Sequence, residues 1–219
     1  MIVAIDGPAG SGKGTVASIL SKKLNLVNID TGATYRCVAL KALKNNLNVE
    51  DKDEIIKLSN NIDIKFDLNN NVYLDGENVT KEIRSKEVTQ IVSPISSIVE
   101  VRKNMVDLQR RLGNSNNIVM EGRDITTVVF PNAEYKFYLD ATLEERVKRR
   151  YKEYQEKNID MSYKEIYENI KNRDYNDSHK EIGSLMRTDD QFYIDSTNLT
   201  IDEVVEKFIK VIEGDKNES

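Results

Sequence analysis

The chain has 219 residues, of which 39% are hydrophobic and 32% are charged, enough for one buried core with a small inserted lobe. Its 32 basic and 37 acidic residues are interleaved and give a formal charge of −5, which argues against nucleic acid as a partner. The one cysteine, Cys37, excludes an internal disulfide framework and is expected to be an inert packing residue. No signal-peptide pattern and no run of 18 apolar residues occur, so we expect a cytoplasmic monomer without membrane partners.

The first predicted strand, IVAI at residues 2–5, is followed by the loop GPAGSGKGT and by a helix predicted over 12–24. The spacing Gly7-x4-Gly12-Lys13 is typical of a phosphate-binding loop, because glycines allow successive backbone N–H groups to surround phosphate oxygens. The helix directs its positive N-terminal end toward the same anion. The alternative is a turn that only lets the strand meet the helix closely. We predict a triphosphate site formed by Gly7, Pro8, Ala9, Gly10, Ser11, Gly12, Lys13, Gly14 and Thr15.

Two later predicted strands each end in a turn that carries an arginine. The run VNI at 27–29 leads into DTGATYR, and the run IVM at 118–120 leads into EGRD. Ligands of an open parallel sheet bind at the carboxyl ends of its strands, so we expect Arg36 and Arg123 to converge on the triphosphate. Guanidinium groups suit a second phosphate bound bidentately, although either arginine taken alone could form a surface ion pair. Glu121 is a candidate Mg²⁺ ligand, directly or through water.

The stretch 62–79 departs from the pattern of buried strands and helices. Its sequence, IDIKFDLNNNVYLDGENV, alternates apolar and polar residues and contains Asp75-Gly76, which is favoured in type I′ hairpin turns. A small antiparallel insert is therefore predicted.

Four helix starts are predicted from Ser/Thr-x-x-Glu signatures, which are typical of capping boxes. The clearest helix covers 97–113, where apolar residues recur at steps of three and four, and Ser97 with Glu100 marks its start. The same signature occurs at Thr142/Glu145, Ser162/Glu165 and Thr200/Glu203.

The runs KFYL at 136–139 and QFYI at 191–194 complete the set of predicted strands. Short apolar strands that alternate with helices predict an α/β fold with a parallel sheet of about five strands flanked by helices. No repeat or linker divides the chain, so we expect a single domain over 1–219 that ends in a frayed tail, EGDKNES.

The chain contains four motifs: IDGPAGSGKGT, DTGATYR, EGRDITTVVFP and RDYNDSHK. They occur in the order and spacing of the bacterial cytidylate kinases, and essentially the whole chain resembles that family. The first motif is shared by nucleoside monophosphate kinases in general, whereas the other three resemble this family specifically. The monophosphate-site signatures of adenylate and thymidylate kinases are absent. The resemblance implies a P-loop NTPase-type sheet, a monophosphate-binding lobe over 31–113 that includes the β insert, and a helical lid over 151–187.

The activity implied by the resemblance is transfer of the γ-phosphoryl group of ATP to CMP, and to dCMP, with Mg²⁺. The acceptor phosphate is already anionic, so the reaction needs no general base; it needs cations that bring two polyanions together in line. A kinase that uses UMP as readily as CMP is the alternative within the class. A nucleotide-binding switch without a small acceptor is the alternative outside it, and an RNA-binding protein would need a basic face.

The resemblance also implies a role for individual residues. Thr31 and Arg36 fall on the positions that hold the acceptor phosphate, and Ser93, Arg102 and Asp124 on those that read cytosine. In the lid, Arg173 and Asp177 fall on positions near the phosphates and the sugar hydroxyls. The implied catalytic residues are Lys13, Arg123, Arg173 and Lys180, and the implied metal ligands are Thr15 and Glu121.

Two positions depart from the family pattern. Lys180 stands where the lid pattern has an arginine, and an ammonium group cannot bridge two oxygens as a planar guanidinium can. Thr126 stands where the pattern has a glycine, and we expect it to be strained if that position requires a positive φ.

Overall fold

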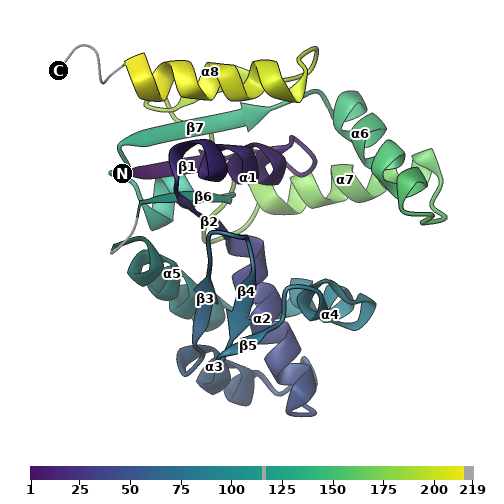
Figure 1. The fold of residues 1–219 in the computed structure, drawn as a ribbon. Helices are drawn as coiled ribbons and strands as arrows, with labels where there is room; N and C mark the ends of the chain where they lie inside the picture. The colour runs from purple at the N-terminus through teal and green to yellow at the C-terminus, as the bar shows by residue number, and fades with distance from the viewer. Residues whose placement is uncertain (115–116, 215–219) are drawn as a thin grey trace. The chain divides into compact units, whose positions relative to one another are not determined.

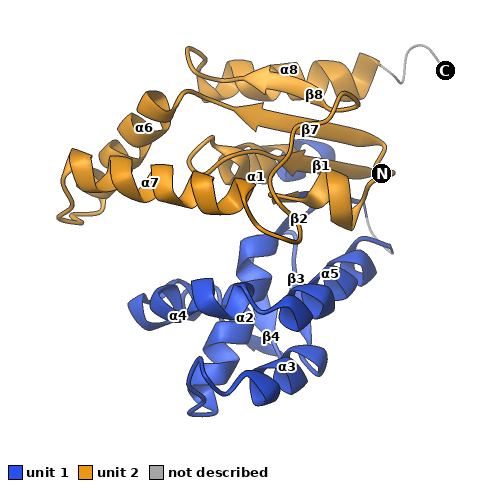
Figure 2. Cartoon of the chain, turned by 180° about the vertical axis from the view of Figure 1, so that it is seen from behind, with its two compact units in different colours: residues 1, 21–120 blue, residues 2–20, 121–219 orange. Residues whose placement is uncertain are grey.

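The computed structural model describes residues 1–114 and 117–214 (Figure 1). Residues 215–219 of the predicted frayed tail lie outside this part of the chain. The chain divides into two compact units (Figure 2). Unit 1 contains Met1 and Ser21–Met120, and unit 2 contains Ile2–Leu20 and the chain from Glu121 onward.

The main sheet has five strands, in the order β2-β6-β1-β7-β8. Strand β1 pairs in parallel with β7, and β7 pairs in parallel with β8. The strands are β1 (Ile2–Asp6), β2 (Val27–Asp30), β6 (Ile118–Gly122), β7 (Tyr135–Asp140) and β8 (Phe192–Asp195). Each strand lies within two residues of its predicted position, and the predicted α/β fold with a parallel sheet flanked by helices is confirmed.

Unit 2 buries apolar side chains of its strands against helices. Helix α8 (Ile201–Gly214) lies along β7 (Figure 1), and the ring centroids of Phe137 and Phe208 are 4.2 Å apart. Helices α6 (Leu143–Glu156) and α7 (Tyr163–Ser178) pack on each other through Val147, Ile166 and Ile170. Three of the four predicted caps are confirmed, because the side chains of Thr142, Ser162 and Thr200 each accept a hydrogen bond from the backbone N–H three residues later. Helix α1 (Lys13–Leu24) follows the phosphate loop as predicted.

Unit 1 contains the predicted antiparallel insert. Its strands β3 (Ile64–Phe66), β4 (Val72–Leu74) and β5 (Glu77–Asn78) pair in that order. Asp75 and Gly76 have φ angles of 50° and 88°, and these positive values are what a type I′ turn requires. The helices of this unit are α2 (Thr31–Lys44), α3 (Lys52–Asn60), α4 (Lys86–Ser96) and α5 (Val99–Asn114), with a 3₁₀ turn, η1 (Glu82–Arg84). Cys37 on α2 is buried, and burial raises the pKa of its thiol to about 12, as expected of an inert packing residue.

The predicted helix start at Ser97 is wrong. Ser97 has helical φ and ψ angles of −87° and −11° and forms the C-cap of α4, so its hydroxyl donates to the carbonyl of Ser93 at 2.9 Å. Helix α5 begins two residues later, at Val99. The Ser-x-x-Glu spacing is present, but a serine caps a helix start only when its own backbone is extended.

Within the described residues, no helix is both long and apolar enough to cross a lipid bilayer.

Candidate functional site

The loop between β1 and α1 has the backbone that a phosphate-binding loop requires. A Cβ atom on Gly7 would lie 2.0 Å from the carbonyl oxygen of Leu139, so a side chain cannot be accommodated there. Gly12 has a φ of 95°, and helix α1 starts with the hydrogen bond from the Val16 N–H to the Gly12 carbonyl. These features direct the N-terminal amides of α1 toward the loop, where they can bind an anion.

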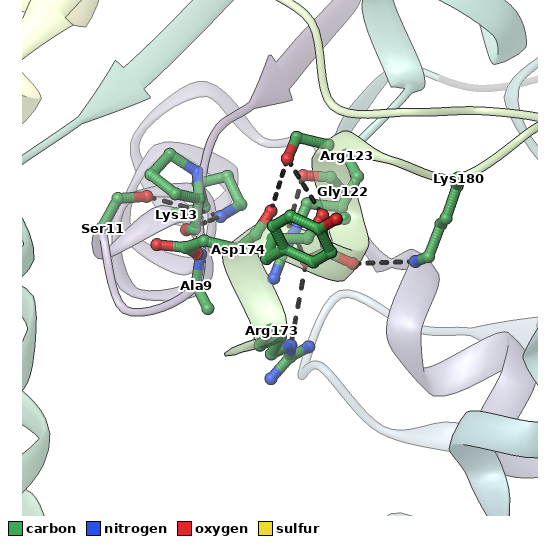
Figure 3. A network of polar contacts seen from close by, with 12 residues as sticks. Ala9, Ser11, Lys13, Gly122, Arg123, Arg173, Asp174 and Lys180 are labelled. Atoms are coloured by element: carbon green, nitrogen blue, oxygen red, sulfur yellow. Dashed lines mark hydrogen bonds and ion pairs between the residues drawn. The ribbon is translucent and has the colours of Figure 1, made fainter. Parts of the chain in front are cut away.

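Lys13 is buried beneath this loop and points back into it (Figure 3). Its Nζ donates to the carbonyl of Pro8 at 2.7 Å and to Ser11 Oγ at 3.4 Å. Burial, followed by the positive charges of Arg123 and Arg173, lowers the pKa of Lys13 to about 7, against the opposing effect of Glu121. A phosphate group bound in the loop would supply negative charge, which favours the protonated form of Lys13.

The other three predicted catalytic residues gather around the carboxylate of Asp177 on α7. Arg123, which directly follows β6, donates from Nε to Asp177 Oδ2 at 2.7 Å, and Lys180 Nζ lies 2.8 Å from Asp177 Oδ1. Arg173 Nε lies 3.9 Å from Asp177 Oδ2. Burial alone would raise the pKa of Asp177, but Arg123 and Lys180 overcome this effect and the pKa is lowered. Asp177 is therefore ionised at neutral pH, and its carboxylate lies beside three cationic side chains.

Glu121 and Thr15 fit the chemistry of a Mg²⁺ ion shared with phosphate. Glu121 lies at the end of β6, and its Oε1 would be 3.5 Å from a Cβ atom on Gly14, so its carboxylate borders the loop. Thr15 is exposed in the first turn of α1. Within residues 1–114 and 117–214, no three His, Cys, Asp or Glu side chains form a metal-binding group. Mg²⁺ commonly takes one or two protein oxygens and completes its shell with phosphate and water, so this donor set suits it.

Unit 1 contains four of the residues that the resemblance assigns to the acceptor. Thr31 begins α2, and Arg36 on the same helix donates from Nη1 to the Ile83 carbonyl at 3.1 Å and to Thr89 Oγ1 at 2.9 Å. Burial lowers the pKa of Arg36. Ser93 is exposed on α4, whereas Arg102 on α5 is buried, with its guanidinium carbon 5.9 Å from the ring centroid of Tyr35.

Unit 2 contains Asp124, the remaining residue assigned to cytosine. Asp124 is buried, and its carbonyl accepts hydrogen bonds from the N–H groups of Val128 and Val129. Arg123, Arg173 and Asp177 belong to the same unit.

Thr126 is not strained in the way that the sequence led us to expect. It lies in a one-turn π-helix (Ile125–Val129) and does not have a positive φ. Its N–H and its hydroxyl donate to Asp6 Oδ2 at 2.8 and 2.6 Å, and its hydroxyl accepts from the side chain of Gln191. Burial raises the pKa of Asp6, although these hydrogen bonds lower it. A threonine is accommodated because its hydroxyl satisfies buried polar groups on two other segments.

Replacement of Thr126 by valine is therefore expected to lower the free energy of unfolding by about 2 kcal/mol, because Asp6 loses a donor and Gln191 loses an acceptor in a buried site. The control is Thr127→Val, since Thr127 Oγ1 is buried without a hydrogen-bond partner among the described residues. Urea unfolding of the two variants measures the difference. Equal stability of the two variants would show that the Thr126 hydroxyl contributes nothing.

Sequence analysis missed two residues that contact the loop. Arg146 on α6 is buried and donates to the Ala9 carbonyl, and Asp174 on α7 accepts from the Ala9 N–H. A signal for Arg146 was present, because it follows Leu143 by three residues and so lies on the helix face that also carries apolar side chains. The motif RDYNDSHK contains Asp174 and so marked this position, but its partner Ala9 is 165 residues away in the chain and the contact could not be inferred.

A glycine-rich loop at the end of β1 of a parallel sheet, a buried lysine and a cluster of cations around Asp177 together define a P-loop kinase. The family described as cytidylate kinase matches residues 3–214. The chain belongs to the cytidylate kinase family, as the motifs indicated.

Relatives agree with this assignment, and two solved structures share the fold. The cytidylate kinase of Clostridioides difficile is 47% identical over 97% of this chain and 98% of that protein, and that of Fusobacterium nucleatum is 46% identical over 97% of each. An uncharacterized protein from Eubacterium ventriosum has a TM-score of 0.55 at 16% identity, over 97% of this chain and 98% of that one. A shikimate kinase from Bacteroides thetaiotaomicron has a TM-score of 0.50 at 11% identity, also over 97% and 98%. At these identities the two structures show a shared fold alone.

Proposed function

We propose that this kinase transfers the γ-phosphoryl group of ATP to CMP, and to dCMP, giving ADP and CDP or dCDP. The observation that carries the proposal is the group of cations around Asp177, because a nucleotide switch needs no second anion site beside its triphosphate loop. The relatives, named cytidylate kinase, support CMP as the acceptor. We further propose that the chain acts as a monomer in the cytoplasm.

In this proposal, backbone amides of the loop and the N-terminus of α1 bind the triphosphate, and Lys13 contacts its outer phosphates. Lys13 would leave the Pro8 carbonyl and Ser11 Oγ to do so, because these are its partners without nucleotide. Mg²⁺, when bound by Thr15 and through water by Glu121, would neutralise charge on the phosphate oxygens.

Five residues are proposed to bind the acceptor. Thr31 and Arg36 bind the CMP phosphate, while Ser93, Arg102 and Asp124 supply donors and acceptors that suit the cytosine ring. Residues 31–113 then form the monophosphate-binding lobe, and residues 151–187 form a lid that closes over both substrates and excludes water.

Transfer of the phosphoryl group depends on charge compensation. Arg123, Arg173 and Lys180 would exchange the carboxylate of Asp177 for phosphate oxygens, which leaves Asp177 to accept hydrogen bonds from the sugar hydroxyls. Because the acceptor phosphate is already anionic, no residue has to remove a proton from it. Positioning and electrostatic stabilisation would therefore provide most of the rate enhancement.

ADP production from ATP and Mg²⁺ tests the proposal when AMP, CMP, dCMP, UMP, GMP or dTMP is offered singly, beside a blank without acceptor. We expect turnover with CMP and dCMP to exceed that with any other acceptor by at least about tenfold, since donors and acceptors in the site must match the base edge. Comparable turnover of UMP would favour the broader kinase. Equal, slow ADP release in every tube, including the blank, would indicate a triphosphatase or switch.

A further inference from the structure

Ala9, the third residue of the phosphate loop, has both of its backbone polar groups bonded to side chains of helices. Figure 3 shows Ala9 and one of these partners, Asp174. The Ala9 N–H donates to Asp174 Oδ1 on α7 at 3.3 Å, and its carbonyl accepts from Arg146 Nη1 on α6 at 2.9 Å. Arg146 and Asp174 are also bonded to each other, with Nη1 and Oδ2 2.6 Å apart. We call these three residues the loop anchor.

Arg146 is fixed in this position by further contacts. Only 6% of the residue is exposed, and its Nε donates to the carbonyl of Ala141 at 2.9 Å. A Cβ atom on Gly10 would lie 3.3 Å from Arg146 Cβ, so the stem of the arginine side chain packs against the loop itself. The guanidinium group is thus held by two backbone carbonyls and one carboxylate, and it has little freedom to serve as a mobile substrate ligand.

The loop anchor also limits which amides are available to a phosphate. Pro8 has no N–H, and the N–H of Ala9 is bonded to Asp174. The N–H of Ser11 donates to the Pro8 carbonyl at 3.4 Å, and the amides from Lys13 onward belong to the first turn of α1.

We propose that Arg146 and Asp174 are positioning residues that hold the phosphate loop, through Ala9, in the shape that binds the triphosphate, and so increase the affinity of the chain for ATP. The inference rests on the proposed function in taking ATP as the phosphoryl donor. A loop held in its bound shape loses less conformational freedom when the ligand binds, and this increases affinity without any direct contact.

Isothermal titration of Mg²⁺ and ATP in the absence of CMP tests the anchor in Asp174→Ala, Arg146→Met and the double variant. Each single substitution is expected to raise the Kd for ATP at least about tenfold. The double variant is expected to raise it no further than the worse single variant, because both side chains act through Ala9. In turnover assays the KM for ATP should rise in parallel, while the KM for CMP changes less than about twofold.

Matched variants separate this role from a loss of stability. Glu168→Ala removes a carboxylate from an exposed position of the same helix and is expected to leave the Kd for ATP unchanged. Asp174→Asn keeps the shape of the side chain and an oxygen that can accept from Ala9, so its Kd should lie between those of the unmodified chain and Asp174→Ala. Thermal melts confirm that each titration is performed on folded protein.

Three results would overturn the inference: a Kd for ATP that is unchanged in Asp174→Ala and Asp174→Asn, a Kd that falls in them, or additive effects in the double variant. A lower Kd would mean that the Asp174 carboxylate competes with phosphate for the loop. If the unmodified chain binds ATP but CMP is no acceptor, the proposed function fails while the titrations still test the anchor.

Discussion

Replacement of Lys13 by methionine is expected to abolish ADP formation and, at the same time, to stabilise the fold. Lys13 is 4% exposed, and burial together with Arg123 and Arg173 lowers its pKa to about 7. Folding at neutral pH therefore transfers an ammonium group into an unfavourable environment, and methionine fills the same space without charge. Turnover should fall by at least about 1,000-fold, because no other group replaces the charge that Lys13 brings to the phosphates.

The gain in stability of Lys13→Met depends on pH, because the folded and unfolded chains bind different numbers of protons at Lys13. The pKa of Lys13 is about 7 in the folded chain, whereas its ordinary value of 10.5 applies to the unfolded chain. Between pH 7 and pH 10.5 the unfolded chain therefore binds more protons than the folded chain. Stability of the unmodified chain then rises with pH over that range. We expect Lys13→Met to raise the free energy of unfolding by on the order of 3 kcal/mol below pH 7, after allowance for its lost hydrogen bonds, and by progressively less toward pH 10.

Chemical unfolding at pH 6 and pH 9 measures this difference. The matched control is Lys22→Met, which removes the same charge from an exposed position of α1 and should change neither turnover nor stability appreciably. Retained turnover in Lys13→Met would contradict the assignment of the phosphate loop. A loss of stability at pH 6 would instead show that the hydrogen bonds to Pro8 and Ser11 outweigh the cost of burying the charge.

Replacement of Arg123 by lysine is expected to lower kcat by about 100-fold to 1,000-fold with little change in stability. Arg123 donates from Nε to Asp177 and from Nη1 to the carbonyl of Gly122 at 3.3 Å. A lysine preserves the charge and can still pair with Asp177, so the fold should tolerate it. It cannot present two parallel N–H groups to a phosphate, and the loss should therefore appear in the transition state.

Steady-state kinetics with CMP and ATP, accompanied by thermal melts, tests this expectation. Arg110→Lys is the control, because Arg110 is exposed on α5 and lies 3.9 Å from Asp107. A kcat within a factor of about three of the unmodified chain would place Arg123 outside the reacting phosphates and make it a structural partner of Asp177.

Local patterns account for the parts of the fold that could be predicted. The turn at Asp75-Gly76 and the cap at Ser162 depend on residues within a few positions of each other, and the structure has both. Ser97 shows the limit of such patterns. Helix α4 continues past Pro94 to Ser96, so the backbone of Ser97 is helical and cannot cap α5. That outcome depends on how α4 ends, which the four residues from Ser97 to Glu100 do not encode.

The candidate site likewise contains residues that local sequence identifies and residues whose role depends on contacts distant in the chain. The phosphate loop is one contiguous segment with its lysine, and its chemistry can be recognised from spacing alone. Arg146 and Asp174 act on that loop from helices far along the chain, and their role depends on the packing of α6 on α7. Strain was expected at Thr126 because the family pattern has a glycine there. The hydrogen bonds that accommodate the threonine could not be foreseen, since their partners, Asp6 and Gln191, are distant in sequence.

The burial of Cys37 makes the native chain well suited to spectroscopic labelling. Its thiol is inaccessible and, with a pKa of about 12, almost entirely protonated at neutral pH, so maleimide dyes should react with it very slowly. Cysteines introduced at Lys57 in unit 1 and Lys148 in unit 2, whose side chains are 69% and 78% exposed, could then carry a donor and an acceptor fluorophore. Energy transfer between them would report the distance between the two units as ATP and CMP are added, in a protein that keeps every other residue of its natural sequence.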